Sequence, residues 1–166
     1  MSRIAQAFQN GKAFIPFVTG GDPDLETTQK LLVAMQEAGA DLIEIGLPFS
    51  DPIAEGVVIQ EANERALAAG CTTDKLFDMV KRARQTVTVP MVFLTYINPI
   101  FTYGKEKFMK RCVECGIDGL ICLFTNHICH LFYVGADLRT HTSHTKRRYH
   151  IDKSFCLSRN HFDSFF

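Results

Sequence analysis

The chain has 166 residues, 46% of them hydrophobic and 22% charged, and its 18 basic and 18 acidic side chains give a formal net charge of zero. This composition is typical of a globular domain with a core, and it argues against nucleic acid or an anionic membrane surface as a partner. We expect no membrane span and no signal peptide, and six cysteines without a secretion signal favour reduced thiols in the cytoplasm.

Strand-like and helix-like segments alternate from the N-terminus. AFIPFVTGG (13–21) predicts a strand that ends in a turn. Asp22 followed by Pro23 predicts a helix start, with Asp22 as the N-cap, and Gly39 predicts the helix end. ADLIEIG (40–46) predicts the second strand.

Further helices and strands follow in the same alternation. An apolar face over 58–69 predicts one helix that ends at Gly70, Thr73 is the expected cap of the next, and Gly116 is the expected end of the helix over 103–116. VPMVFLTYINP (89–99) predicts a strand buried on both faces, YGKEKFMKRCVECG (103–116) a helix, and IDGLIC (117–122) a fourth strand. This pattern indicates a parallel α/β sheet, and both a doubly wound sheet and a (β/α)₈ barrel fit it.

Glu44 interrupts the second strand. Alternate residues of a strand share a face, so Glu44 should lie opposite Ile43 and Ile45, near the carboxyl end of the strand. Ligands bind at that end in parallel α/β folds. A partly desolvated glutamate there would have a raised pKa and could transfer protons.

The loop after this strand is rigid and acidic. Pro48 and Pro52 stiffen it, and Asp51 and Glu55 add two carboxylates. The alternative to an acid/base site is that Glu44 pairs with a basic group or caps a backbone amide, in front of an ordinary turn. The residues alone support both interpretations equally.

Four segments resemble the α subunit of tryptophan synthase: FVTGGDPDLETT, AGADLIEIGLPFSDPIAEG, IQEANERALAAG and TYINPIFTYG. The similarity covers about residues 3–122. It implies the N-terminal half of a (β/α)₈ TIM barrel, about four βα units. It also implies a lyase of tryptophan biosynthesis that splits indole-3-glycerol phosphate into indole and glyceraldehyde 3-phosphate, without cofactor or metal.

The resemblance implies site residues as well. Glu44 matches the family's acid/base glutamate, and Glu55 stands where the family usually has an aspartate that contacts the indole nitrogen. The extra methylene of Glu55 puts the rate in doubt more than the chemistry. Phe17, Leu94 and Tyr96 would line the indole pocket, although core packing explains Phe17 and Leu94 equally well.

The same matching implies a protein partner. The family's α subunit joins a β subunit in an α₂β₂ tetramer, and the β subunit binds pyridoxal phosphate. The residues that match the family's surface against the β subunit are Pro48, Phe49, Asp51, Pro52 and Asn98.

The composition changes near Cys122. Residues 1–122 carry 12 basic and 15 acidic side chains, a net charge of −3, whereas 123–166 carry 6 and 3, a net charge of +3. All six histidines lie at or beyond His127, and no proline follows Pro99. We therefore expect a partial barrel domain over 1–122 and an unrelated tail over 123–166 without helix or strand, translated out of frame. The nucleotide sequence near codon 122 would test the frameshift.

A complete barrel takes about 250 residues and binds phosphate after strands seven and eight. We therefore expect negligible lyase activity from this chain alone, with strands one and four as open edges. A non-catalytic fragment is the alternative.

Two other functions compete with the lyase. A zinc module could use Cys112, Cys115, His127 and His130, but both gaps are one residue short of the usual spacing, and buried core thiols explain the cysteines better. A sugar-phosphate epimerase barrel would need metal-binding histidines, which 1–122 lacks.

Overall fold

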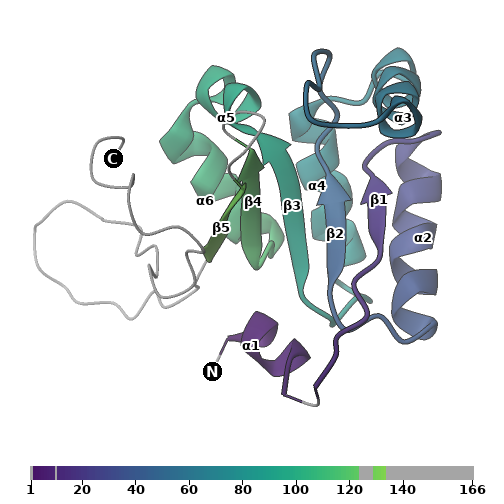
Figure 1. The fold of residues 1–166 in the computed structure, drawn as a ribbon, viewed down its shortest axis with the longest axis vertical. Coiled ribbons are helices and arrows are strands. Elements are labelled where there is room, and N and C mark those ends of the chain that lie inside the picture. The colour runs from purple at the N-terminus through teal and green to yellow at the C-terminus, as the bar shows by residue number, and fades with distance from the viewer. Residues whose placement is uncertain (1, 10, 124–128, 134–166) are drawn as a thin grey trace, which may run out of the picture.

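The computed structural model describes residues 2–9, 11–123 and 129–133 (Figure 1). Its helices are α1 (Arg3–Ala7), α2 (Leu25–Glu37), α3 (Val57–Ala68), α4 (Thr73–Ala83), α5 (Ile97–Tyr103) and α6 (Lys105–Cys115). Its strands are β1 (Phe17–Thr19), β2 (Ile43–Gly46), β3 (Met91–Tyr96), β4 (Gly119–Leu123) and β5 (Cys129–Tyr133). The four strands expected within 1–122 are all present.

The sheet follows chain order. β1, β2, β3 and β4 are parallel neighbours, and β5 joins β4 antiparallel. The crossover helices α2, α4 and α6 lie along one face of the sheet, and α3 and α5 lie beyond the ends of the strands (Figure 1). A doubly wound sheet would reverse its strand order and carry helices on both faces. The arrangement is therefore a segment of a (β/α)₈ barrel.

The main core fills the space between the sheet and these helices. Phe77 of α4 packs edge-on against Phe93 of β3 and Phe108 of α6, with ring centroids 5.6 Å and 5.2 Å apart. All three rings are at most 1% exposed. Burial of each such ring contributes about 1.5–3 kcal/mol to stability, so this cluster joins the second and third crossover helices to the sheet.

The opposite face of the sheet is the inner face of the barrel segment. Leu42 and Val92 lie on it, and Ile4 of α1 packs against both with only 3% of its surface exposed. Ser2 caps α1, because its hydroxyl oxygen accepts a hydrogen bond from the Ala5 amide. The short α1 therefore covers the end of the inner face at which the strands begin.

Arg84 follows α4 and ties several segments together. Its guanidinium, 14% exposed, donates to the carbonyl oxygens of Gly116, Val87 and Val89 at 2.7–3.0 Å. It also donates to the Asp118 carboxylate at 2.6 Å. These bonds hold the chain that precedes β3 against the chain that precedes β4.

Asp118 completes this network. Its carboxylate also accepts from the Met91 amide at 3.0 Å and from Arg3 at 2.8 Å. Because only 9% of the Asp118 side chain is exposed, a lost partner would leave a poorly solvated charge. The network therefore couples α1, β3 and β4 at the lower end of the sheet.

Both predicted helix caps were wrong by one or two residues. Asp24, not Asp22, caps α2 by accepting a hydrogen bond from the Thr27 amide at 2.7 Å. Asp22 instead forms a two-point ion pair with Arg65 of α3, with both N–O distances at 2.8 Å. The sequence could not show this competing partner, which lies 43 positions away.

Thr72 rather than Thr73 caps α4, because its hydroxyl accepts from the Lys75 amide. The expected glycine ends are confirmed: Gly39, Gly70 and Gly116 all have positive φ, near 90°, 76° and 83°. L-residues with a side chain rarely adopt this backbone conformation, so glycine is favoured at each of these ends.

Two further predictions need correction. The strand expected to reach Pro99 ends at Tyr96, and 97–103 forms α5, whose first turn tolerates a proline. A strand, β5, also lies in the tail where none was expected. β4 is therefore not an open edge, because its free backbone groups pair with β5, and such pairing does not depend on side-chain alternation. Apart from Leu123 at the end of β4, the rest of the tail lies outside the described residues, and the frameshift stays a prediction.

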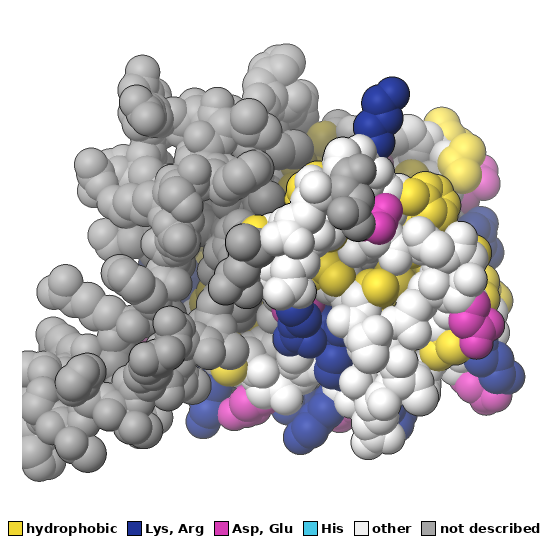
Figure 2. All heavy atoms as spheres, turned by 90° about the horizontal axis from the view of Figure 1, so that it is seen from below, with side chains coloured by type: hydrophobic (Ala, Val, Ile, Leu, Met, Phe, Trp, Pro, Cys, Tyr) yellow, Lys and Arg dark blue, Asp and Glu magenta, His cyan; other side chains and the backbone are white. Residues whose placement is uncertain are grey.

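Charged groups of both signs are interspersed over the described surface at the end where the strands begin, with hydrophobic side chains between them (Figure 2). Within the described ranges, none of the helices is both long enough and apolar enough to cross a membrane.

We expect Asp118→Ala to lower the free energy of unfolding by about 3–5 kcal/mol, because it leaves the buried Arg84 charge unpaired. Urea unfolding followed by circular dichroism measures this loss. Glu26→Ala is the control, because it breaks the exposed Glu26–Lys30 pair and should change stability little. Equal losses in the two variants would contradict a structural role for the network.

Candidate functional site

The strand register brings three of the predicted site residues onto one face. Glu44 is paired with Phe17 of β1 on one side and Val92 of β3 on the other, and Leu94 lies next to Gly46. Register partners in parallel strands point to the same side of the sheet. Phe17, Glu44 and Leu94 therefore share the inner face, as predicted for Glu44, while Ile43 and Ile45 are fully buried under the helices.

The Glu44 carboxylate is half-buried and has no hydrogen-bond or ion-pair partner among the described residues. Burial raises the pKa of this carboxyl group above its ordinary value. Among the described residues, Glu44 therefore neither pairs with a basic group nor caps a backbone amide, which was the alternative to an acid/base role. Glu44 is a desolvated acid that points to the inner face.

Phe17 lies beside Glu44 because residue 46 has no side chain. A Cβ added at Gly46 would lie 2.7 Å from Cζ of the Phe17 ring, closer than real contacts allow. The ring therefore lies over the backbone of β2 at Gly46, two residues after Glu44. This places an aromatic surface next to the acid.

Tyr96, at the end of β3, joins the strand to the acidic loop. Its side chain follows the alternation of Val92 and Leu94, and its hydroxyl oxygen accepts a hydrogen bond from the Ala54 amide at 2.9 Å. Its ring centroid lies 5.4 Å from that of Phe49. Tyr96 therefore fixes the loop that carries Glu55.

Glu55 is held by two amide side chains of α3. The Asn63 amide nitrogen donates to Oε2 of Glu55 at 2.9 Å. Gln60 donates to the backbone carbonyl of Glu55 at 2.9 Å and to that of Pro52 at 3.4 Å. Burial raises the pKa of Glu55, and the Asn63 hydrogen bond partly offsets that rise.

Neither amide was predicted as a site residue from the sequence. Gln60 and Asn63 are three residues apart, the spacing that places two side chains on the same side of a helix. The available signal was the position of Asn63, next to Ala62 and four residues after Ile59, at the edge of the predicted apolar face. Nothing local in the sequence showed which group it would bind.

The residues matched to a partner surface lie at the end of the sheet where the strands finish. Pro48, Phe49 and Pro52 are half-buried, whereas Asp51 and Asn98 are exposed. Two large apolar side chains beside them, Ile53 of the same loop and Phe101 of α5, are 66% and 51% exposed.

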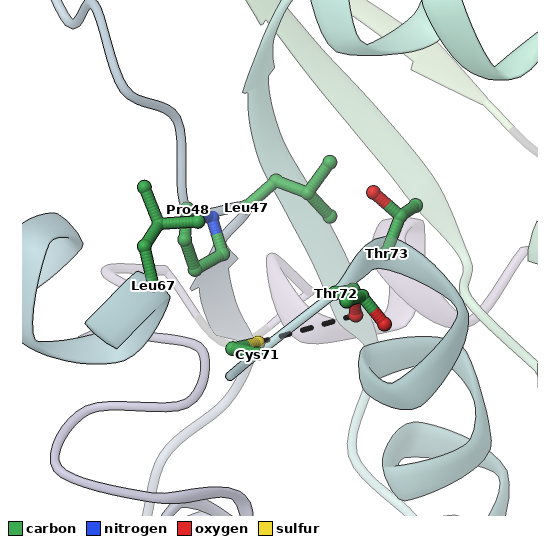
Figure 3. Close-up of a pocket in the computed structure, with 6 residues that line it drawn as sticks. All are labelled: Leu47, Pro48, Leu67, Cys71, Thr72 and Thr73. Atoms are coloured by element: carbon green, nitrogen blue, oxygen red, sulfur yellow. Dashed lines mark hydrogen bonds between the residues drawn. The ribbon is translucent and has the colours of Figure 1, made fainter. Parts of the chain in front are cut away.

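A separate small pocket of about 200 Å³ opens between this loop and the neighbouring helices (Figure 3). Its lining residues are Leu47, Pro48, Leu67, Cys71, Thr72 and Thr73. Burial raises the pKa of the Cys71 thiol, which makes it a poor nucleophile. Leu47 alternates with Ile43 and Ile45, so this pocket lies on the helix side of the sheet and not on the side of Glu44.

The two cysteines of the alternative zinc site are buried in the core. Cys112 and Cys115 are at most 2% exposed in the main core, and burial raises the pKa of the Cys115 thiol to about 11. His127 lies outside the described residues, as does the side chain of His130. Within the described part of the chain, no group of three or more His, Cys, Asp or Glu could hold a metal ion.

Comparison with known families identifies the fold. The family model for the tryptophan synthase alpha chain matches residues 4–123. The chain belongs to this family. A tryptophan synthase alpha chain of Lacticaseibacillus casei is 51% identical over 121 residues, which cover 73% of this chain and 46% of the relative. One from Alkaliphilus metalliredigens is 52% identical over 126 residues, covering 73% and 47%.

Solved structures of the family agree. The subunit alpha structure from Legionella pneumophila superposes with a TM-score of 0.70 at 43% identity, covering 74% of this chain and 49% of that one. A chain of the tryptophan synthase complex from Pyrococcus furiosus gives 0.64 at 41% identity, covering 67% and 46%. The predicted TIM-barrel segment is thereby confirmed. The chain spans about half the length of the relatives it matches.

We expect Glu44→Gln to raise the Tm at neutral pH. Because burial raises the pKa of Glu44 in the folded chain, its charged form costs stability. That cost develops as the pH rises through the unfolded pKa and is complete above the folded pKa, so the gain should vanish near about pH 4. Thermal unfolding at both pH values tests this. Glu37→Gln, an exposed control on α2, should not raise the Tm; a lower Tm for Glu44→Gln would instead reveal a structural partner.

Proposed function

We propose that this chain supplies the acid/base half of a lyase site, in which indole-3-glycerol phosphate is split into indole and glyceraldehyde 3-phosphate. The observation that carries the proposal is the Glu44 carboxylate, which is half-buried on the inner face beside the Phe17 ring and has no partner among the residues that the structure describes. An unpartnered acid beside an aromatic surface suits a substrate that is an indole.

The chemistry has three requirements. Cleavage of the carbon–carbon bond requires a proton at the indole ring carbon, stabilisation of the ring N–H and removal of a glycerol hydroxyl proton. Glu44 would exchange protons with the substrate, since burial raises its pKa and so makes its protonated form easier to reach than that of an exposed glutamate. Glu55 would accept a hydrogen bond from the ring N–H. The apolar walls of the indole pocket would come from Phe17, Leu94 and Tyr96, and neither cofactor nor metal is needed for this reaction.

The same end of the sheet would meet the tryptophan synthase β subunit, in a cytoplasmic α₂β₂ assembly. Pro48, Phe49, Asp51, Pro52 and Asn98 would form the contact. Exposed Ile53 and Phe101 support it, because large apolar side chains grouped at a surface favour a protein partner. The functional segment would be residues 1–122, which end within β4.

Indole should bind to the purified chain. The chain contains no tryptophan, so the fluorescence of added indole reports binding directly, as a blue shift with increased anisotropy. Gly46→Ala should weaken binding up to about tenfold, because the new Cβ displaces the Phe17 ring. Gly56→Ala is the matched control, since a Cβ there meets nothing within 4 Å. Unchanged indole fluorescence, or equal effects of the two variants, would contradict the pocket.

Turnover by the 166-residue chain alone should be negligible. The four parallel strands described here supply the acid/base groups, whereas barrels of this kind bind phosphate after strands seven and eight. We expect a kcat/KM at least about 100-fold below that of a complete family member, measured as indole released from indole-3-glycerol phosphate. Glu44→Gln provides the blank for contaminating host enzyme. Turnover near that of a complete relative would overturn this expectation.

A further inference from the structure

The first two turns of α3 fold back onto the loop that precedes them. Gln60 binds two backbone carbonyls of that loop, those of Pro52 and Glu55, and fixes its path. Asn63 contacts the Glu55 side chain itself. Of these two amides, only Asn63 can therefore decide where the carboxylate lies.

We infer that Asn63 is a positioning residue for Glu55, a role that rests on the proposed function of Glu55 and deepens it. Asn63 is 3% exposed on a regular helix, so its own position is fixed by packing. Its amide nitrogen lies 2.9 Å from Oε2 of Glu55. The amide must present its N–H groups here, because its carbonyl oxygen would repel a carboxylate.

This hydrogen bond gives the two carboxylate oxygens of Glu55 different roles. Oε2 is occupied by Asn63, whereas Oε1 has no partner among the described residues. A single free oxygen of fixed direction is what an indole N–H donor requires. The hydrogen bond also favours the charged form of Glu55, which accepts a hydrogen bond better than the protonated form does.

The contact also gives the longer side chain of Glu55 a defined end point. A glutamate has one more rotatable bond than an aspartate, and an unrestrained carboxylate would sample several directions. The bond to Asn63 selects one of them, at the cost of burying an amide that must stay paired. The side-chain lengths at positions 55 and 63 are therefore matched, because together they span the distance that this hydrogen bond bridges.

Carboxyl ¹³C NMR titration of the full 166-residue chain tests this role without substrate. The Glu55 signal is assigned by its loss in Glu55→Gln. Asn63→Leu, which removes the donor at similar volume, should raise the titration midpoint of Glu55. Asn63→Asp, which keeps the size but adds a like charge, should raise it further and serves if the leucine variant does not fold.

Gln36→Leu is the matched control. Gln36 is also an amide that fastens a loop, since its Oε1 accepts from the Thr88 amide at 2.6 Å. Its loss should lower the Tm without moving the Glu55 midpoint, so a purely structural effect is separated from positioning. Unchanged Glu55 midpoints in both folded Asn63 variants would overturn the inference.

A length swap adds a second readout. Glu55→Asp should lose the hydrogen bond to Asn63, because the shorter side chain withdraws from it, and adding Asn63→Gln should restore the bond by returning the summed length. The titration midpoint of the carboxyl group at position 55 should then be lower in the double variant than in Glu55→Asp alone, and equal midpoints count against the matched pair. If the midpoint shifts as expected but indole never binds the unmodified chain, the positioning role stands and the proposed lyase function fails.

Discussion

A parallel sheet must be covered on both faces, and this one constraint organises the chain. The crossover helices cover one face completely, which is why Ile43, Ile45 and Phe93 are fully buried. Ile4 of α1 covers the lower end of the inner face, whereas Phe17, Glu44 and Leu94 farther along the strands are only half-buried. The Glu44 carboxylate on this second face is therefore partly desolvated by the surrounding sheet, and no described residue pairs with its charge.

The end of the sheet where the strands begin and the end where they finish consequently differ in the charged groups that they carry. The lower end carries the Arg84–Asp118 network, in which a buried charge is fully paired and serves stability. The upper end carries Glu44, a half-buried acid that has no partner in the described structure, and Glu55, which has one. Such a division is characteristic of barrels, whose chemistry collects where the strands end and whose stability collects where they begin.

Sequence patterns predicted the features that depend on the periodicity of neighbouring residues. They missed the features that depend on contacts between residues far apart in the chain. Alternation along β2 placed Glu44 opposite Ile43 correctly, and glycines marked three helix ends. The cap of α2 was wrong because Asp22 binds Arg65, and the role of Tyr96 in holding Ala54 spans 42 positions. The five residues of α1 are too few for a helical period to be recognised, and β5 is known only from its pairing with the backbone of β4, which no period in the tail indicated.

The fastening of the acidic loop has a consequence for how such a site is inherited. Glu55, Gln60 and Asn63 lie within nine consecutive positions, so the acid and both amides that hold it are encoded by one short stretch of gene. Substitution, duplication or recombination of that stretch would move the carboxylate together with its support. A change in the length of the acidic side chain at position 55 can then be compensated by a change at position 63, without alteration of the remainder of the barrel.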